Sequence, residues 1–358
     1  MRFVRTIAIF LIIALCPLLG SLFYFKANAE DLTPYVDKDK FMISMEQSKK
    51  SIEKLLSNST DLLEQTQDMK DSIDGQSANV ILQDQILRDM ITISNQQKSL
   101  YGETYEKYIY APFGREIDSY ISNDVEIKLY EVIEPNYRGH VAKVKLYNPS
   151  TLSVSLGQGE FGKSETTSEA VVRTGSIFGI NAGGFFYSAH TGTSLCYPVG
   201  NTMLSGSLVE QFRLPTEEGL FFSGFTGDGR LVGGVYNDQQ DLINSGAVWG
   251  TSFVPILIQD RQSLPIPRKW KNARHPRTIV GNLHNGDLFF MVIDGRQPGW
   301  SNGVTLEEIQ RKLLKMGAIS AYNLDGGGST SMVFKDKIIN RPSDGNERKV
   351  VSNILINR

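Results

Sequence analysis

A strand–turn–strand segment near the C-terminus constrains the fold more than any other feature of this chain. Residues 318–334 read AISAYNLDGGGSTSMVF, with strand-like apolar stretches on both sides of a glycine-rich turn. The turn consists of Gly326, Gly327 and Gly328, followed by Ser329 and Thr330. Consecutive glycines cost backbone entropy and add no packing. Such a turn usually directs its backbone N–H groups at a bound anion, and the two hydroxyl residues add hydrogen-bond donors beside them.

Short strands and turns continue over residues 101–358. Val125, Ile127 and Leu129 alternate in a first predicted hairpin, which turns at EPNYRG. A second predicted hairpin, RTIVGNLHNGDLFFMVIDGR, turns at an Asn-Gly pair. One helix is predicted between Thr305, which forms a capping box with Glu308, and Gly317. Because strands dominate, we expect an α+β fold with a mixed or antiparallel sheet and few helices.

Composition narrows the function classes. Hydrophobic residues make up 41% and charged residues 21% of the 358 residues, as in proteins with a real core. The net charge of -2 gives no sign of a nucleic-acid partner. The two cysteines, Cys16 and Cys196, argue against a small disulfide-stapled scaffold.

The N-terminus predicts export. Arg2 and Arg5 precede an uncharged run over residues 7–25, and roughly 19 apolar residues suffice to cross a bilayer as a helix. The arginines place the rest of the chain outside the cell membrane. Ala27-Asn28-Ala29 resembles a signal-peptide cleavage site, so residues 1–29 are either a membrane anchor or a cleaved signal. The length of the run favours a single-pass anchor, and cleavage leaves secretion as the alternative.

Residues 30–100 are expected to form a helical stalk. Their sequence is polar and almost free of glycine and proline, and its spaced apolar residues partly fit a heptad seam. Lys49 and Lys70 interrupt that seam. A weak coiled coil, which would support an oligomer, and helices packed back on the main domain both remain open. Residues 101–358 then form the main domain.

Polar residues gather at four predicted strand ends in that domain, where a rigid sheet often holds catalytic groups. The clusters are Asn181-Ala182-Gly183-Gly184, Arg274-His275-Pro276-Arg277, Asp294-Gly295-Arg296 and Asn323-Leu324-Asp325 with the glycine turn; a fifth, Asn340-Arg341-Pro342 with Glu347-Arg348, lies downstream. Apart from the triple glycine, each cluster alone is more often a structural turn or a solvated surface. Together they predict an anion site, because arginine binds phosphate with two parallel bonds. A P-loop is excluded, since no lysine follows the glycines.

The ordered set of motifs is similar to the phosphodiester glycosidase family. The carrying motifs are GINAGGFF, HPRTIVG, MVIDGR, TLEEIQRKLLKMGAISAYNLDGGGSTSMVF and VSNILI, over roughly residues 125–358. That family includes the enzyme that removes N-acetylglucosamine from phosphodiester-linked mannose on lysosomal proteins. One departure is Ala182, where the family often has glycine.

The resemblance implies hydrolysis of the bond between a sugar's anomeric carbon and a phosphodiester oxygen. It implies catalytic roles for Asp325, Asp294, Arg296 and Arg277. The substrate-binding residues that we expect are Asn181, Gly183, Gly184, Gly326, Gly327, Gly328, Ser329, Thr330 and Arg348.

Either carboxylate could act on the sugar. We assign that role to Asp325 and let Asp294 orient Arg296 or a sugar hydroxyl, and the reverse assignment stays open. The sequence identifies no definite cofactor, and a divalent cation on the carboxylates stays open without a His or Cys cluster to hold it.

We expect the partner to be a phosphodiester-linked glycan or envelope polymer, as in exopolysaccharide or cell-wall assembly. Two other readings remain. One is a non-catalytic protein that binds an anionic envelope polysaccharide, and the other is a structural protein that acts through its stalk.

Overall fold

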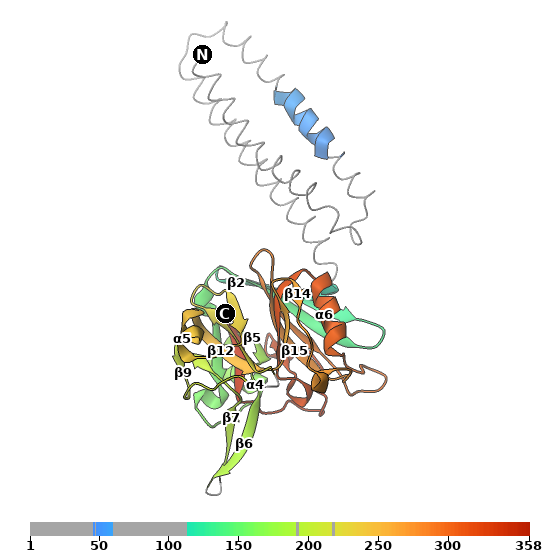
Figure 1. Ribbon diagram of the computed structural model, residues 1–358. Helices are drawn as coiled ribbons and strands as arrows, with labels where there is room; N and C mark the ends of the chain where they lie inside the picture. Colours follow the sequence, from blue (N-terminus) through green and yellow to red (C-terminus); the bar gives the residue numbers. More distant parts are fainter. Residues whose placement is uncertain (1–45, 47, 60–112, 191–192, 217–218) are drawn as a thin grey trace, which may run out of the picture. The chain divides into compact units, whose positions relative to one another are not determined.

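The computed structural model describes residues 46, 48–59, 113–190, 193–216 and 219–358 (Figure 1). Two compact units, residues 1–108 and 109–358, make up the chain and are described separately. In the first unit, residues 48–59 are helical. The predicted N-terminal span and most of the predicted stalk lie outside the described residues and stay predictions. In the described part of the chain, no helix has the length and apolarity to cross a membrane.

An eight-stranded sheet forms the largest part of the second unit. Its strands, in spatial order, are β1 (Arg115–Ile121), β2 (Val125–Ile133), β3 (Arg138–Leu146), β16 (Leu288–Ile293), β15 (Arg277–Leu283), β17 (Ala318–Leu324), β13 (Ile256–Gln259) and β14 (Gln262–Ser263). Both predicted hairpins are confirmed. β2 pairs with β3, with Ile127 opposite Val144, and β15 pairs with β16 around Asn285-Gly286.

Three smaller sheets complete this unit. One contains β19 (Lys337–Ile338), β18 (Met332–Phe334), β5 (Ser176–Asn181), β20 (Ser352–Asn357) and β4 (Leu152–Leu156). Another contains β11 (Leu231–Gly234), β10 (Phe221–Thr226), β12 (Ala247–Phe253), β8 (Met203–Leu204) and β9 (Ser207–Leu208). The last is a hairpin of β6 (Phe185–His190) and β7 (Thr193–Pro198). Every strand pairing among the described residues is antiparallel, which confirms the predicted antiparallel, strand-dominated fold.

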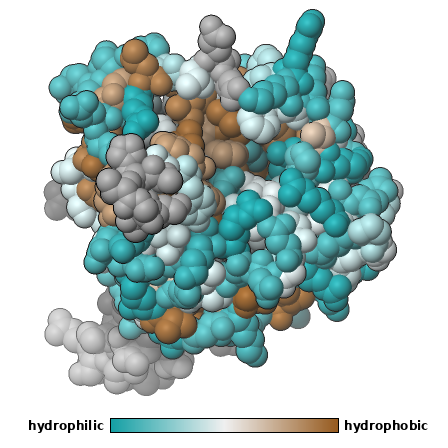
Figure 2. Space-filling model, turned by 90° about the horizontal axis from the view of Figure 1, so that it is seen from below, coloured by the Kyte–Doolittle hydropathy of each residue, from teal (hydrophilic) through white to brown (hydrophobic). Residues whose placement is uncertain are grey.

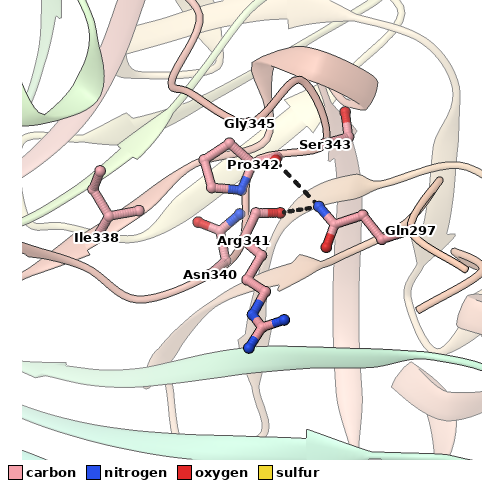
Figure 3. A pocket seen from close by; sticks show the side chains of 7 residues that line it. All are labelled: Gln297, Ile338, Asn340, Arg341, Pro342, Ser343 and Gly345. Carbon is pink, nitrogen blue, oxygen red and sulfur yellow. Dashed lines mark hydrogen bonds between the residues drawn. The ribbon is translucent and has the colours of Figure 1, made fainter. Parts of the chain in front are cut away.

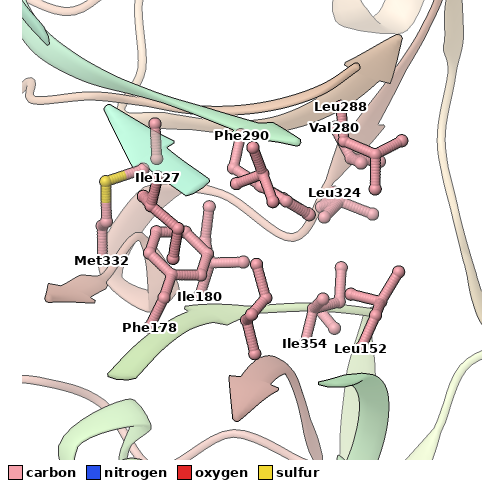
Figure 4. Packing of buried hydrophobic residues seen from close by; sticks show 14 of the residues in the cluster. Ile127, Leu152, Phe178, Ile180, Val280, Leu288, Phe290, Leu324, Met332 and Ile354 are labelled. Atoms are coloured by element: carbon pink, nitrogen blue, oxygen red, sulfur yellow. The ribbon is translucent and has the colours of Figure 1, made fainter. Parts of the chain in front are cut away.

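The main core joins the eight-stranded sheet to the sheet that contains β5 (Figure 4). Phe290 of β16 packs against Phe178 of β5 with ring centroids 5.3 Å apart. Ile180 and Ile354 extend this layer from β5 and β20, and both are buried. Burying a side chain of this size stabilises the fold by about 1.5–3 kcal/mol. The core therefore fixes the ends of strands from two sheets relative to each other.

Helices cover the outer faces. α6 (Leu306–Lys315) begins with the predicted capping box of Thr305 and Glu308, and its buried residues join a second core on the other face of the large sheet. α4 (Thr167–Thr174) was not predicted, although Thr166 and Glu169 form the same capping box. The remaining short elements are α5 (Gln239–Asn244), η2 (Pro149–Thr151), η3 (Gly157–Gly159), η4 (Arg268–Trp270) and η5 (Gly327–Ser329).

Candidate active site

Strand register brings the two aspartates to one edge of the large sheet. β15 lies between β16 and β17, with Arg277 opposite Ile293 and Thr278 opposite Leu324. Asp294 and Asp325 directly follow those partner strands. They therefore flank the start of β15, with their backbones about 10 Å apart, which is two strand spacings.

Asn181 connects this edge to the end of β5. Its side chain is fully buried, and its Nδ2 donates to the Asp325 carbonyl oxygen at 2.6 Å. Its Oδ1 accepts from Thr278 Oγ1 at 2.9 Å and from the Ser331 amide at 3.0 Å. Asn181 thus shapes the site by holding β5, β15 and the glycine turn together rather than by facing solvent.

Gly183 and Gly184 allow β12 to approach closely. A Cβ on Gly183 would lie 1.8 Å from Thr251 Oγ1, and a Cβ on Gly184 would lie 2.7 Å from a ring carbon of Phe253. Their small size is therefore a packing requirement behind the site.

The glycine turn gives room to two guanidinium groups. A Cβ on Gly327 would lie 3.2 Å from Arg296 Nη2, and a Cβ on Gly328 would lie 2.0 Å from Arg348 Nη2. Gly327 also has a φ of 60°, in the left-handed region that favours glycine. Two cationic groups therefore rest where side chains of other residues would lie.

The expected cradle of free backbone amides is wrong for much of the turn. The Gly327 amide donates to Pro276 O at 3.0 Å, while the amides of Ser329 and Thr330 each donate at 3.2 Å to carbonyls of the turn itself. A 3₁₀ turn, η5, uses these donors internally. Positive charge at this edge therefore comes from arginine side chains.

Asp325 has a proton affinity suited to catalysis near neutral pH. Burial raises the pKa of Asp325 to about 6, while the Ser329 hydroxyl, Arg348 and the Gly326 amide lower it. The Ser329 hydroxyl is buried and forms no hydrogen bond of standard geometry among the described residues. The Asp325 side chain stays partly exposed. A carboxyl of this kind can both carry charge and accept a proton.

Asp294 is committed to internal hydrogen bonds. It is 1% exposed, and its oxygens accept from Trp300 Nε1 at 2.8 Å and from the Arg341 amide at 3.0 Å. Burial raises its pKa, and these donors lower it. The expectation that Asp294 orients Arg296 is wrong, because its partners are Trp300 and Arg341.

The three arginines have different surroundings. Arg277 is 5% exposed and donates to the carbonyl oxygens of Ala273 and Val304, and burial lowers its pKa to about 10. Arg296 is exposed and lies 3.3 Å from His275 Nδ1. Arg348 Nη2 donates to Asp344 Oδ2 at 2.5 Å. Arg296 and Arg348 can therefore meet a ligand directly, whereas Arg277 is held inside the loops.

Thr330 is likewise internal. It is 1% exposed, its Oγ1 accepts from Thr278 Oγ1 at 3.4 Å, and its carbonyl oxygen accepts from Asn340 Nδ2 at 3.0 Å. Of the predicted residues, Asp325, Arg296 and Arg348 form the accessible group. Asn181, Arg277, Asp294 and Thr330 support it from beneath.

Two neighbours of the site, Trp300 and Asp344, were not predicted from the sequence. Trp300 lies under two guanidinium groups, those of Arg138 and Arg341, which are 4.4 Å and 3.7 Å from the centroid of its ring. Asp344 was missed because nothing in its surroundings in the sequence marks it. Trp300 could have been found from its position six residues after Asp294, since it is one of only 3 tryptophans.

An open pocket of about 480 Å³ lies beside these residues (Figure 3). It is lined by Gln297, Ile338, Asn340, Arg341, Pro342, Ser343 and Gly345. The Gln297 amide donates to the carbonyl oxygens of Arg341 and Pro342, both at 3.1 Å. These bonds attach the loop after β19 to the segment that carries Arg296.

The described residues contain no group of three or more His, Cys, Asp or Glu side chains that could hold a metal ion. The cation that the sequence left open on the carboxylates therefore has no three-residue ligand set there.

Comparison with known proteins places this site in a family. The phosphodiester glycosidase family pattern matches residues 174–357, just over half of the chain and all of the predicted site residues. A Bacillus subtilis (strain 168) protein, SPbeta prophage-derived uncharacterized protein YomE, is 30% identical over 197 residues, covering 54% of this chain and 29% of YomE. N-acetylglucosamine-1-phosphodiester alpha-N-acetylglucosaminidase of Bos taurus is 29% identical over 200 residues, covering 51% of this chain and 36% of that enzyme.

A solved structure supports the fold alone. The zebrafish N-acetylglucosamine-1-phosphodiester alpha-N-acetylglucosaminidase catalytic domain, auto-inhibited by its pro-peptide, superimposes with a TM-score of 0.53 at 20% identity, covering 68% of this chain and 86% of that one. The chain spans about a third of the length of the curated relatives that it matches. On the sequence match, the chain belongs to the phosphodiester glycosidase family.

Proposed function

We propose that this chain hydrolyses the bond between the anomeric carbon of a sugar and a phosphodiester oxygen. The observation that carries the proposal is the position of Asp325, whose pKa burial raises to about 6, beside a glycine turn against which Arg296 and Arg348 rest. An acid of this kind next to two cationic groups fits a substrate with a phosphate on one side of the scissile bond and a sugar on the other.

The chemistry of the leaving group determines which roles the arginines and Asp325 would have. A phosphate departs as a stable anion, so it needs less protonation than a sugar alkoxide. Arg296 and Arg348 would stabilise its charge as the bond breaks. Asp325 would face the sugar, where it either stabilises the oxocarbenium-like carbon or removes a proton from the attacking water.

The geometry favours Asp325 over Asp294 for this role. Asp294 is 1% exposed, and both of its oxygens already accept hydrogen bonds. A carboxylate buried in this way holds its donors, Trp300 and the Arg341 amide, and is not exposed to a sugar.

The substrate that we propose is a phosphodiester-linked glycan of the cell envelope. This part of the proposal rests on the expected export of the main domain by the N-terminal span, as an anchor or a cleaved signal, with the stalk as an oligomer contact. The names of the mammalian relatives suggest an α-N-acetylglucosaminyl phosphodiester as the first compound to test.

The deciding experiment measures sugar release from that diester and from an α-glucosyl diester by the full-length chain and by Asp325→Asn. Asp336→Asn is a matched control, because Asp336 is an exposed aspartate paired with Arg358. Release by the wild type and the control but not by Asp325→Asn supports the proposal. If a folded wild type releases no sugar but Asp325→Asn still binds the diester equally well, the non-catalytic binding reading replaces it.

A further inference from the structure

The β6–β7 hairpin forms a separate arm. It is a two-stranded sheet on its own, and it projects from the lower side of the domain in Figure 1. Its root follows directly on the residues of the candidate site, because two glycines separate Ala182 from Phe185. We use "the arm" for residues Phe185–Pro198 together with Phe161, whose ring packs against the hairpin.

One face of the arm presents a contiguous set of aromatic rings. Phe186 lies directly opposite Tyr197 in the strand register, and their rings stack with centroids 5.7 Å apart. Phe161, from the loop after η3, packs edge-on against Tyr197 at 5.4 Å. Phe161 and Phe186 are each 43% exposed. Single exposed aromatic residues are ordinary, but a connected exposed cluster marks an interaction surface.

The root of the arm is hydrogen-bonded to the site. The Asp325 amide donates to the Ala182 carbonyl oxygen at 3.0 Å, and the Val199 amide donates to the Gly184 carbonyl oxygen at 2.8 Å. Seen from below, this side of the molecule shows hydrophobic surface next to a broad hydrophilic area (Figure 2). The backbone at the root of the arm therefore lies next to the backbone of Asp325.

We propose that the aromatic face of the arm, formed by Phe161, Phe186 and Tyr197, binds sugar rings of the glycan that carries the scissile phosphodiester. This inference rests on the proposed function and adds a second, uncharged part to its binding site. The C–H face of a pyranose ring packs on an aromatic ring, and tyrosine adds a hydroxyl for the polar edge of the sugar.

The arm and the proposed phosphate site differ in charge. The sequence from Phe185 to Pro198 contains no Lys, Arg, Asp or Glu. It therefore suits neutral sugar units, while Arg296 and Arg348 suit the phosphate. Binding to an anionic membrane surface is a poorer fit, because that interaction depends on basic residues.

The test measures binding without turnover. The parent protein is the whole chain with Asp325→Asn, kept in mild detergent because of its predicted anchor. We measure its retention by a poly(N-acetylglucosamine 1-phosphate) gel and by a neutral α-glucan gel. Phe186→Ala and Phe161→Ala are then added separately. Tyr147→Ala is the matched control, because Tyr147 is 49% exposed and lies outside the arm. Thermal unfolding checks that each variant is folded.

We expect each arm variant to weaken polymer binding by roughly tenfold, the loss typical of a central aromatic contact, and Tyr147→Ala to leave it unchanged. Equal binding by arm variants and control, or no binding by the parent chain, overturns the proposal. The proposal is also overturned if the arm variants keep their polymer binding but lose self-association. It is overturned as well if they keep their polymer binding but lose binding to vesicles of anionic phospholipid. Release of sugar from the small diesters tests the proposed function independently. If the chain binds polymer through the arm but cleaves no diester, the inference about the arm stands and the proposed function does not.

Discussion

Asn181 and Asp325 are joined by a hydrogen bond from the Asn181 side-chain amide to the Asp325 carbonyl oxygen, 2.6 Å long. Two further bonds, from Thr278 and the Ser331 amide to Asn181 Oδ1, make this side chain the common partner of β5, β15 and the turn. The position of the candidate acid therefore depends on a residue from a different sheet.

Asn181→Ala should lower both stability and activity. It leaves buried donors without an acceptor, at a cost of about 1–3 kcal/mol each, and it frees the backbone of Asp325. Denaturant unfolding and sugar release measure the two effects. Asn237→Ala, on an exposed residue, is the control and should change neither. A fully stable Asn181→Ala protein would contradict this account.

Gly328→Ala should reduce function while sparing stability. The new Cβ would lie 2.0 Å from Arg348 Nη2 and 2.2 Å from Asp344 Oδ2, and both are ends of side chains nearly half exposed. These groups can move away, so the free energy of unfolding should change by less than about 1 kcal/mol. Sugar release or phosphate binding should fall, because Arg348 leaves the turn.

Gly326→Ala provides the contrast. Its Cβ would lie 2.8 Å from the Pro276 carbonyl oxygen, a backbone atom that cannot move freely. This substitution should destabilise the protein by about 1–3 kcal/mol. If both variants unfold alike, the distinction between displaced side chains and displaced backbone does not hold.

The fold was largely predictable because its signals are local. Alternating apolar residues indicated β2 and β3, an Asn-Gly pair located the turn between β15 and β16, and a capping box located α6. The placement of Asp294 and Asp325 at strand ends also followed from local pattern.

Their separate roles were not predictable, because they depend on contacts distant in sequence. The Arg341 amide reaches Asp294 across 47 positions, and Asn181 reaches Asp325 across 144. The expected free amides failed for a related reason. Composition indicates a glycine turn, but only its geometry shows that the Gly327 amide donates to Pro276.

Activity should rise with pH through about 6. The ordinary pKa of an aspartate is 3.8, and burial raises that of Asp325 to about 6, so the carboxylate needed for catalysis forms only above that pH. The pH profile of kcat/KM should show an acidic limb near 6. A limb near 4 would show that Asp325 is not the titrating group or is not buried.

Stability should change in the opposite direction. Between pH 4 and 6 the folded Asp325 holds a proton that the unfolded chain has lost, so its contribution is full below about 3.8 and declines as pH rises to 6. The total decline is at most about 3 kcal/mol. Asp325→Asn should remove it, so the difference in unfolding free energy between variant and wild type, measured by urea titration at pH 4, 5, 6 and 7, should grow in favour of the variant.

Trp300→Phe should destabilise the protein more than Trp270→Phe. Trp300 Nε1 donates to the buried Asp294 carboxyl, whereas Trp270 Nε1 is buried without a hydrogen-bond partner among the described residues. Loss of the first donor should cost about 1–3 kcal/mol, and the second change should be close to neutral. Because Asp294 then has one donor fewer, its raised pKa should rise further and the cost should grow with pH. Equal effects of the two substitutions on urea midpoints would rule out the proposed role of Trp300.

Asp344→Asn should increase affinity for anions. Arg348 donates to Asp344 Oδ2 at 2.5 Å, and this hydrogen bond together with the charges of Arg348 and Arg296 lowers the pKa of Asp344, so the free protein holds a carboxylate against Arg348. A phosphate must compete with that carboxylate. Exposed ion pairs contribute about 0.2–1 kcal/mol, so their removal should tighten binding of inorganic phosphate by up to about fivefold. Calorimetric titration measures the change, and Asp336→Asn, which breaks the exposed pair with Arg358, is the matched control. Arg348→Gln should weaken binding in the same assay. Weaker binding by Asp344→Asn would mean that Asp344 positions Arg348 for the ligand instead of competing with it.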